Sequence, residues 1–210
     1  MLRSLIPLAS ALSLGLAQND YTNQSAPFSL VLSSTVNETL NGLKLAACHA
    51  GSQTEALCIG QSSLEDPSFT TFYFNTSTPL PGSIPNDLQS GLLTWLYPGG
   101  DNPTISFSQA MSIQYNDASN LAFPIFLNTD GASIAFTTED LMAVPSSVND
   151  AIAQPVPWEG TNGVTFIDNR WAICRTYWVG YEYVALQWVL GDQAPQNPSC
   201  QSVTVKRVWV

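Results

Sequence analysis

From residue 28 onward, short apolar runs alternate with clusters of turn-forming residues. The runs are rich in β-branched and aromatic residues, and a new one begins about every 10 to 15 residues, a spacing typical of antiparallel sandwiches and barrels. We therefore predict a β protein. The predicted strands are residues 28–32, 43–48, 56–59, 69–74, 92–97, 105–115, 121–127, 133–137, 164–167, 171–175, 183–190 and 203–210.

The connections contain proline, glycine and asparagine, as at residues 98–103 and 128–131. Proline fixes φ, while glycine and asparagine accept positive φ, so these clusters end strands. No apolar stripe has the 3.6-residue period of a helix over a useful length. Residues 141–152 come nearest, and Pro145 interrupts them. We interpret residues 145–162, which include Trp158, as a surface excursion within a single domain.

The last predicted strand changes its apolar parity around Lys206 and Arg207, which predicts a β-bulge. An apolar terminal strand is stable only when it is paired, and residues 28–32 are its natural partner because chain termini tend to lie close together. Pairing of the first strand with the last removes a sheet edge. The expected fold class is therefore all-β, a single antiparallel domain, with a β-trefoil-like barrel favoured over a β-sandwich.

Residues 1–17 have the pattern of a secretory signal peptide. Arg3 supplies the positive charge, residues 5–16 form a short apolar run, and small residues precede the expected cleavage after Ala17. The run is too short to span a bilayer, which needs about 20 apolar residues. We expect residues 18–210 to be a single secreted β domain, located extracellularly or in a cell wall.

The composition and the net charge limit the classes of molecule that this protein can bind. The chain has 210 residues and a formal net charge of −10, with 16 acidic residues against 6 basic ones. An acidic surface disfavours nucleic acid and anionic membranes as partners. The 45% hydrophobic and 10% charged composition is the reverse of the disordered signature. No later segment is long and apolar enough to span a membrane, and the oligomeric state is left open.

Four cysteines, Cys48, Cys58, Cys174 and Cys200, indicate two disulfides in an oxidising compartment. Three pairings are possible. We favour Cys48 with Cys58 and Cys174 with Cys200, because each pair flanks one local excursion between apolar runs.

Three sequons, at Asn23, Asn37 and Asn75, are candidate sites of N-glycosylation in a secreted protein. The sequons at Asn102 and Asn197 are excluded because a proline follows each asparagine.

Catalytic constellations are scarce. His49 is the only histidine, and it follows a cysteine that we expect to be in a disulfide. A glycosidase needs two facing carboxylates, and Glu139 or Asp140 could meet Glu182 or Asp168 in space. Acidic residues at turns, keeping the surface soluble, are the simpler reading. We assign no catalytic residue and no cofactor, and keep the carboxylate pair as an alternative.

Hard oxygen donors at Asp117, Asn120, Asn128 and Asp130 raise the possibility of a calcium site. Their spacing matches no metal-binding loop, and turn chemistry explains the asparagine, aspartate and glycine residues without a metal. We assign no metal.

Aromatic residues concentrate in the last third of the chain. Many of them are expected in the core, since a β core uses large apolar side chains. Residues 177–183 contain Gly180 and predict a hairpin tip, whose aromatic side chains cannot all face inward. Trp178 and Tyr181 are therefore candidates for stacking against sugar rings, because exposed aromatic patches tend to mark binding sites.

Five segments carry a family resemblance: NGLKLAACHAG at residues 41–51, FYFNTS at 72–77, RWAICRTYWVGYEY at 170–183, PQNPSC at 195–200 and VTVKRV at 203–208. Together they resemble a family of small secreted proteins of filamentous ascomycete fungi, carried as a domain of unknown function, with some members labelled IgE-binding. The resemblance implies a fungal extracellular or cell-wall location. It implies no reaction and no catalytic residues.

The sequence thus predicts a secreted fungal surface or cell-wall protein without enzymatic activity, with polysaccharide or cell-wall glycan as the favoured partner. One alternative is a carbohydrate-active hydrolase that uses two carboxylates. Another is a secreted effector or antigen that binds a host protein.

Overall fold

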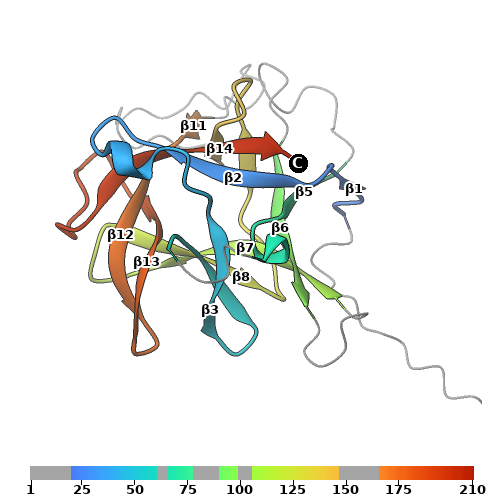
Figure 1. Ribbon diagram of the computed structural model, residues 1–210, viewed down its shortest axis with the longest axis horizontal. Coiled ribbons are helices and arrows are strands. Elements are labelled where there is room, and N and C mark those ends of the chain that lie inside the picture. Colours follow the sequence, from blue (N-terminus) through green and yellow to red (C-terminus); the bar gives the residue numbers. More distant parts are fainter. Residues whose placement is uncertain (1–19, 61–65, 78–89, 99–105, 147–165) are drawn as a thin grey trace, which may run out of the picture.

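A computed structural model describes residues 20–60, 66–77, 90–98, 106–146 and 166–210 (Figure 1). Within these residues the chain forms fourteen strands, all antiparallel to their partners, and two short 3-10 helices, η2 (Glu38–Leu40) and η4 (Pro67–Phe69). The predicted all-β antiparallel fold is confirmed. The strands are β1 (Asn23–Gln24), β2 (Phe28–Ser33), β3 (Ala46–Gly51), β4 (Thr54–Cys58), β5 (Phe72–Thr76), β6 (Ser90–Pro98), β7 (Ser106–Tyr115), β8 (Leu121–Leu127), β9 (Ile134–Phe136), β10 (Met142–Ser146), β11 (Phe166–Asp168), β12 (Trp171–Trp178), β13 (Tyr181–Val189) and β14 (Gln201–Trp209).

Hydrogen-bonded neighbours form a circuit of eight strands, which runs β2, β14, β12, β13, β8, β7, β6, β5 and returns to β2. The return is a single register pair, Phe28 with Phe72. Strand β4 pairs with both β8 and β13, and so enters between them at one end. The trefoil-like form of this sheet stays a prediction.

Strands β2 and β14 run side by side across the top of the view in Figure 1. Their register runs without a break from Phe28 opposite Trp209 to Ser33 opposite Thr204. The predicted pairing of residues 28–32 with the last strand is therefore present. The predicted bulge is wrong, because Arg207 occupies a core-facing position in a regular strand.

Arg207 can lie there because its charge is partnered. The guanidinium carbon lies 4.3 Å from the centroid of the Phe136 ring and 4.4 Å from that of Trp209. Its Nε and Nη2 donate to Oδ1 of Asp140 at 2.9 and 2.6 Å. Cation–π contact and the ion pair together replace the water that the guanidinium loses.

The main core draws side chains from every strand of the circuit and includes Phe28, Trp95 and Trp171, each at most 1% exposed. A buried indole needs an acceptor for its N–H. Trp95 donates to the carbonyl of Ser68, and Trp171 donates to the carbonyl of Met142, both at 2.8 Å. Many aromatic side chains of the described residues are thus used in packing.

Strand β10 replaces the helix-like stretch of the sequence analysis. It pairs with β9 and with β11, where Pro145 lies opposite Ile167. The two-residue strand β1 was likewise not predicted. The predicted signal peptide at residues 1–17 and Trp158 lie outside the described residues. In the part of the chain that the structure describes, no helix has the length and apolar character needed to cross a membrane.

Both disulfides have the predicted pairing. Cys48 joins Cys58 within the β3–β4 hairpin, and Cys174 of β12 joins Cys200 just before β14. The second bond fixes the segment between β13 and β14 against the sheet.

Candidate functional site

The β12–β13 hairpin projects toward the lower edge of Figure 1, next to the hairpin that contains β3. Its turn consists of Val179 and Gly180, with φ of 48° and 86°. Positive φ at both positions is the requirement of the two-residue type I′ hairpin turn. The predicted hairpin tip is therefore present, although a β-branched residue is an unusual choice at positive φ.

A groove of about 630 Å³ lies where the β7–β8 turn, the end of β12 and the loop before β14 meet. We call it the hairpin groove. Its described lining consists of Gln114, Tyr115, Asn116, Asp117, Ala118, Ser119, Leu121, Phe123, Thr176, Tyr177, Trp178, Gln187, Gln196 and Asn197.

Aromatic side chains form one part of this lining. Tyr115 and Tyr177 are 69% and 71% exposed, so their rings are available to a ligand. Trp178 is half-buried, and its ring packs against Phe123 with centroids 5.2 Å apart. Tyr181 is 67% exposed but is not among the lining residues. The structure thus separates the two predicted stacking residues: Trp178 borders the groove and Tyr181 does not.

The polar walls are held in place by backbone and amide hydrogen bonds. Asn120 N donates to Gln196 Oε1 at 3.0 Å, and Gln196 N donates in return to Asn120 Oδ1 at 2.8 Å. Asn197 Nδ2 donates to the carbonyl of Arg175 at 2.8 Å. These bonds tie the β7–β8 turn to the loop before β14, and that loop to β12. The groove is preformed, as ligand sites usually are.

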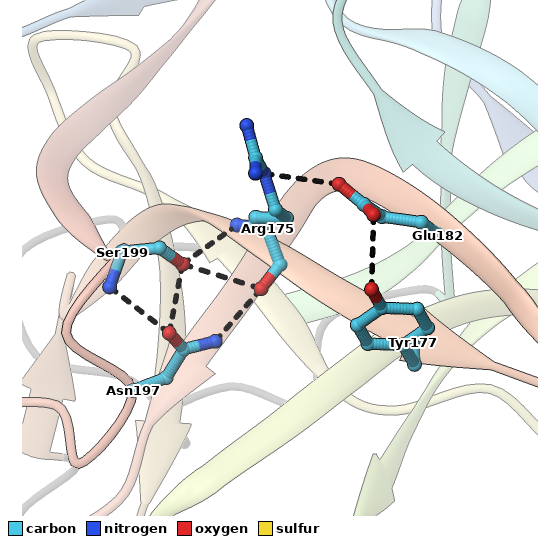
Figure 2. A network of polar contacts seen from close by, with 5 residues as sticks. All are labelled: Arg175, Tyr177, Glu182, Asn197 and Ser199. Atoms are coloured by element: carbon cyan, nitrogen blue, oxygen red, sulfur yellow. Dashed lines mark hydrogen bonds and ion pairs between the residues drawn. The ribbon is translucent and has the colours of Figure 1, made fainter.

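Figure 2 shows a network of polar contacts, two members of which, Tyr177 and Asn197, line the hairpin groove. Glu182 accepts a hydrogen bond from Tyr177 Oη at 3.0 Å and forms a 3.0 Å ion pair with Arg175. The hydrogen bond to Glu182 raises the pKa of Tyr177 above its ordinary value. Ser199 Oγ accepts from the backbone N–H of Arg175 at 3.0 Å, and Asn197 accepts from the Ser199 N–H at 3.0 Å. The network orients the Tyr177 ring.

The candidate carboxylates of the sequence analysis are engaged separately. Asp140 bonds Arg207 of β14, and Glu182 bonds Arg175 and Tyr177 of β12. Asp117 is the single carboxylate among the described residues that line the hairpin groove. His49 is exposed on β3 and is not part of the lining.

The four oxygen donors considered for calcium flank β8 on opposite ends. Asp117 and Asn120 precede this seven-residue strand, and Asn128 and Asp130 follow it. At about 3.3 Å per residue the strand spans roughly 23 Å, so the four cannot share one ion. The described residues contain no cluster of three His, Cys, Asp or Glu side chains able to hold a metal.

The three sequon asparagines differ in burial. Asn23 is exposed on β1. Asn37 caps η2, accepting from the Thr39 N–H at 3.0 Å, and its Nδ2 donates to Gln201 at 2.6 Å. Asn75 is only 7% exposed. Glycosylation of all three stays a prediction, and burial makes Asn75 the least favourable carrier.

Among the groove residues that the sequence analysis did not select are Tyr115, Tyr177 and Gln187. Tyr115 lies at the end of a long predicted strand, directly before the Asn-Asp turn, and a tyrosine beside a turn could have indicated exposure. Gln187 stands among apolar residues of β13, and a polar residue in a buried strand needs a reason.

The chain matches a domain of unknown function (DUF7907) over residues 25–209. No curated protein and no solved structure matches it. Because the match spans nearly all of the described strands, the chain belongs to the DUF7907 family.

Proposed function

We propose that this protein binds neutral glycans in the hairpin groove. The observation that carries the proposal is the pairing of two exposed tyrosine rings, Tyr115 and Tyr177, with a preformed lining rich in side-chain amides. A sugar presents apolar C–H faces, which pack on aromatic rings, and hydroxyls, which exchange hydrogen bonds with amides. Apolar walls with a few placed polar groups are the usual composition of a ligand site.

The charge of the groove favours a neutral ligand. Its described lining contains no lysine or arginine and a single acid, Asp117. Sulfated sugars, polyuronic acids and nucleic acids would need basic partners. The formal charge of −10 for the whole chain acts in the same direction.

The proposed setting is the cell surface or wall of a filamentous fungus. Its supports are the signal-like residues 1–17, the family resemblance, and two disulfides, which are compatible with an oxidising extracellular compartment.

The closed pairing circuit also supports a barrel form for the domain. Attachment of the groove to a rigid barrel would limit the conformational entropy that is lost when a ligand binds.

Binding is favoured over hydrolysis because a two-carboxylate mechanism needs two acids about 5 to 10 Å apart across the scissile bond. Asp117 has no second acid beside it among the described lining residues. A hydrolase would therefore have to work by another arrangement.

The test is retention on insoluble chitin, β-glucan and mannan. The unmodified protein should be retained on at least one of them, and Tyr177→Ala should lower its retention at least tenfold. The matched control is Tyr181→Ala, which removes an equally exposed tyrosine of the same hairpin outside the lining. Retention on none of the three by a folded sample, or equal losses in both variants, would contradict the proposal.

A further inference from the structure

Gln187 is a buried polar side chain in the lining of the hairpin groove. It is 3% exposed, and its Nε2 has no hydrogen-bond partner among the described residues. A buried amide N–H without an acceptor is costly, and native proteins keep such groups rarely. An unpartnered donor on a residue that lines a groove points to the acceptor of a ligand as its partner.

The residues around Gln187 indicate which kind of chemical group would carry the acceptor. The residue lies opposite Ala172 on β12, and the adjoining Trp188 and Val189 pair with the start of β8. From β8, Leu121 and Phe123 contribute apolar side chains to the same lining. The groove lining therefore brings the unpartnered Nε2 of Gln187 together with two apolar side chains, Leu121 and Phe123.

An acetamido group presents both complements: a carbonyl oxygen that only accepts hydrogen bonds, and a methyl group. A sugar hydroxyl in the same place offers an acceptor but no apolar surface, and it also brings a donor that needs a partner of its own. The acceptor-only carbonyl is the better match to a site with an orphaned donor.

We infer that the hairpin groove selects N-acetylated amino sugars, with Gln187 donating from Nε2 to the acetamido carbonyl while Leu121 and Phe123 contact its methyl group. This inference depends on the proposed glycan-binding function and names the ligand class within it. Gln187 is then the residue that determines specificity, and the tyrosines contribute to binding of any sugar ring.

A pair of matched ligands tests this on the unmodified protein. Calorimetry is run with the trimer of N-acetylglucosamine and with the glucose trimer of the same linkage, which has a hydroxyl in place of each acetamido group. The acetylated trimer should bind roughly tenfold tighter or more, the factor that one hydrogen bond to a buried donor provides. Equal affinities would overturn the inference while leaving glycan binding in place. Failure of both trimers and of all three insoluble glycans would overturn the proposed function as well.

A variant assigns the selectivity to Gln187. Gln187→Met keeps the length of the side chain and removes its amide, so it should abolish the preference for the acetylated trimer. The acetylated trimer should lose more affinity than the glucose trimer, so that the two bind equally. Thermal unfolding confirms that the variant is folded, and a folded Gln187→Met protein that keeps the preference would show that the acetamido group is recognised elsewhere.

Discussion

Glu55 of β4 offers a test of how this core handles a carboxyl group. The residue is 3% exposed, and its Oε2 has no hydrogen-bond partner among the described residues. Gln109 of β7 lies beside Glu55, and its Oε1 is also buried without a hydrogen-bond partner among the described residues. Its Nε2 donates to the carbonyl of Gln53 at 2.9 Å. Burial raises the pKa of Glu55 to about 7, and the hydrogen bond from Gln109 only partly opposes this. A protonated Glu55 gains an O–H donor, for which the unpartnered oxygen of Gln109 is the available acceptor.

The consequence is a pH-dependent stability. Between pH 4.5 and 7 the folded protein keeps the proton on Glu55 and the unfolded chain releases it, so the free energy of unfolding falls as the pH rises. The loss is complete above pH 7. A rise in pKa from 4.5 to about 7 corresponds to about 3 kcal/mol.

Glu55→Gln removes this dependence, because an amide supplies an N–H donor at every pH. The variant's free energy of unfolding, measured relative to the unmodified protein by denaturant titration, should rise by about 3 kcal/mol between pH 4.5 and pH 8. The melting temperature should change by about 6 to 12 °C in the same direction. Glu139→Gln, an exposed control, should follow the unmodified protein across this range. Parallel pH profiles for Glu55→Gln and the unmodified protein would refute the reasoning.

Three further predictions concern stability, and denaturant titration checks each. Val179→Asn should stabilise the protein by about 1 kcal/mol, because asparagine tolerates the left-handed backbone of that turn better than valine; a destabilised variant would show that the side chain of Val179 is needed. Arg207→Met should cost about 2 kcal/mol or more because it leaves Asp140 without its partly buried partner, whereas Arg175→Met at the exposed pair with Glu182 should cost less than about 1 kcal/mol. Equal costs would contradict the burial argument. Replacing both cysteines of either disulfide with serine should cost about 3 kcal/mol, and a larger loss for the 10-residue loop than for the 26-residue loop would contradict the chain-entropy account.

Much of the fold could be predicted because alternation and turn chemistry act locally. The range of β8 was predicted to the residue, since its apolar run 121–127 is bounded by asparagine on both sides. Strand β10 was missed because methionine, alanine and proline carry little β signal, and its pairing with β9 and β11 decides its conformation. Arg207 misled the bulge prediction for a related reason. A charged residue in a strand is expected to face solvent. The sequence does not show that Phe136 and Asp140 lie beside Arg207 and let it face the core.

The candidate site was harder to predict than the fold. Trp178 could be selected because a glycine turn placed it near a hairpin tip. Whether it or Tyr181 borders a groove depends on the β7–β8 turn, which lies about 60 residues earlier in the chain and on a different hairpin. Gln187 is selected because its Nε2 has no hydrogen-bond partner among the described residues, and the sequence does not show this.

The seam between β2 and β14 also constrains the order in which the molecule can form. Its six register pairs join residues 28–33 to residues 204–209, so this ladder cannot assemble until residues 204–209 have been synthesised. Until then β2 carries an open edge in a growing polypeptide, the kind of surface that aggregates or recruits chaperones. Closure of the seam should therefore be a late and slow event, in keeping with the low rates of chains dominated by long-range contacts.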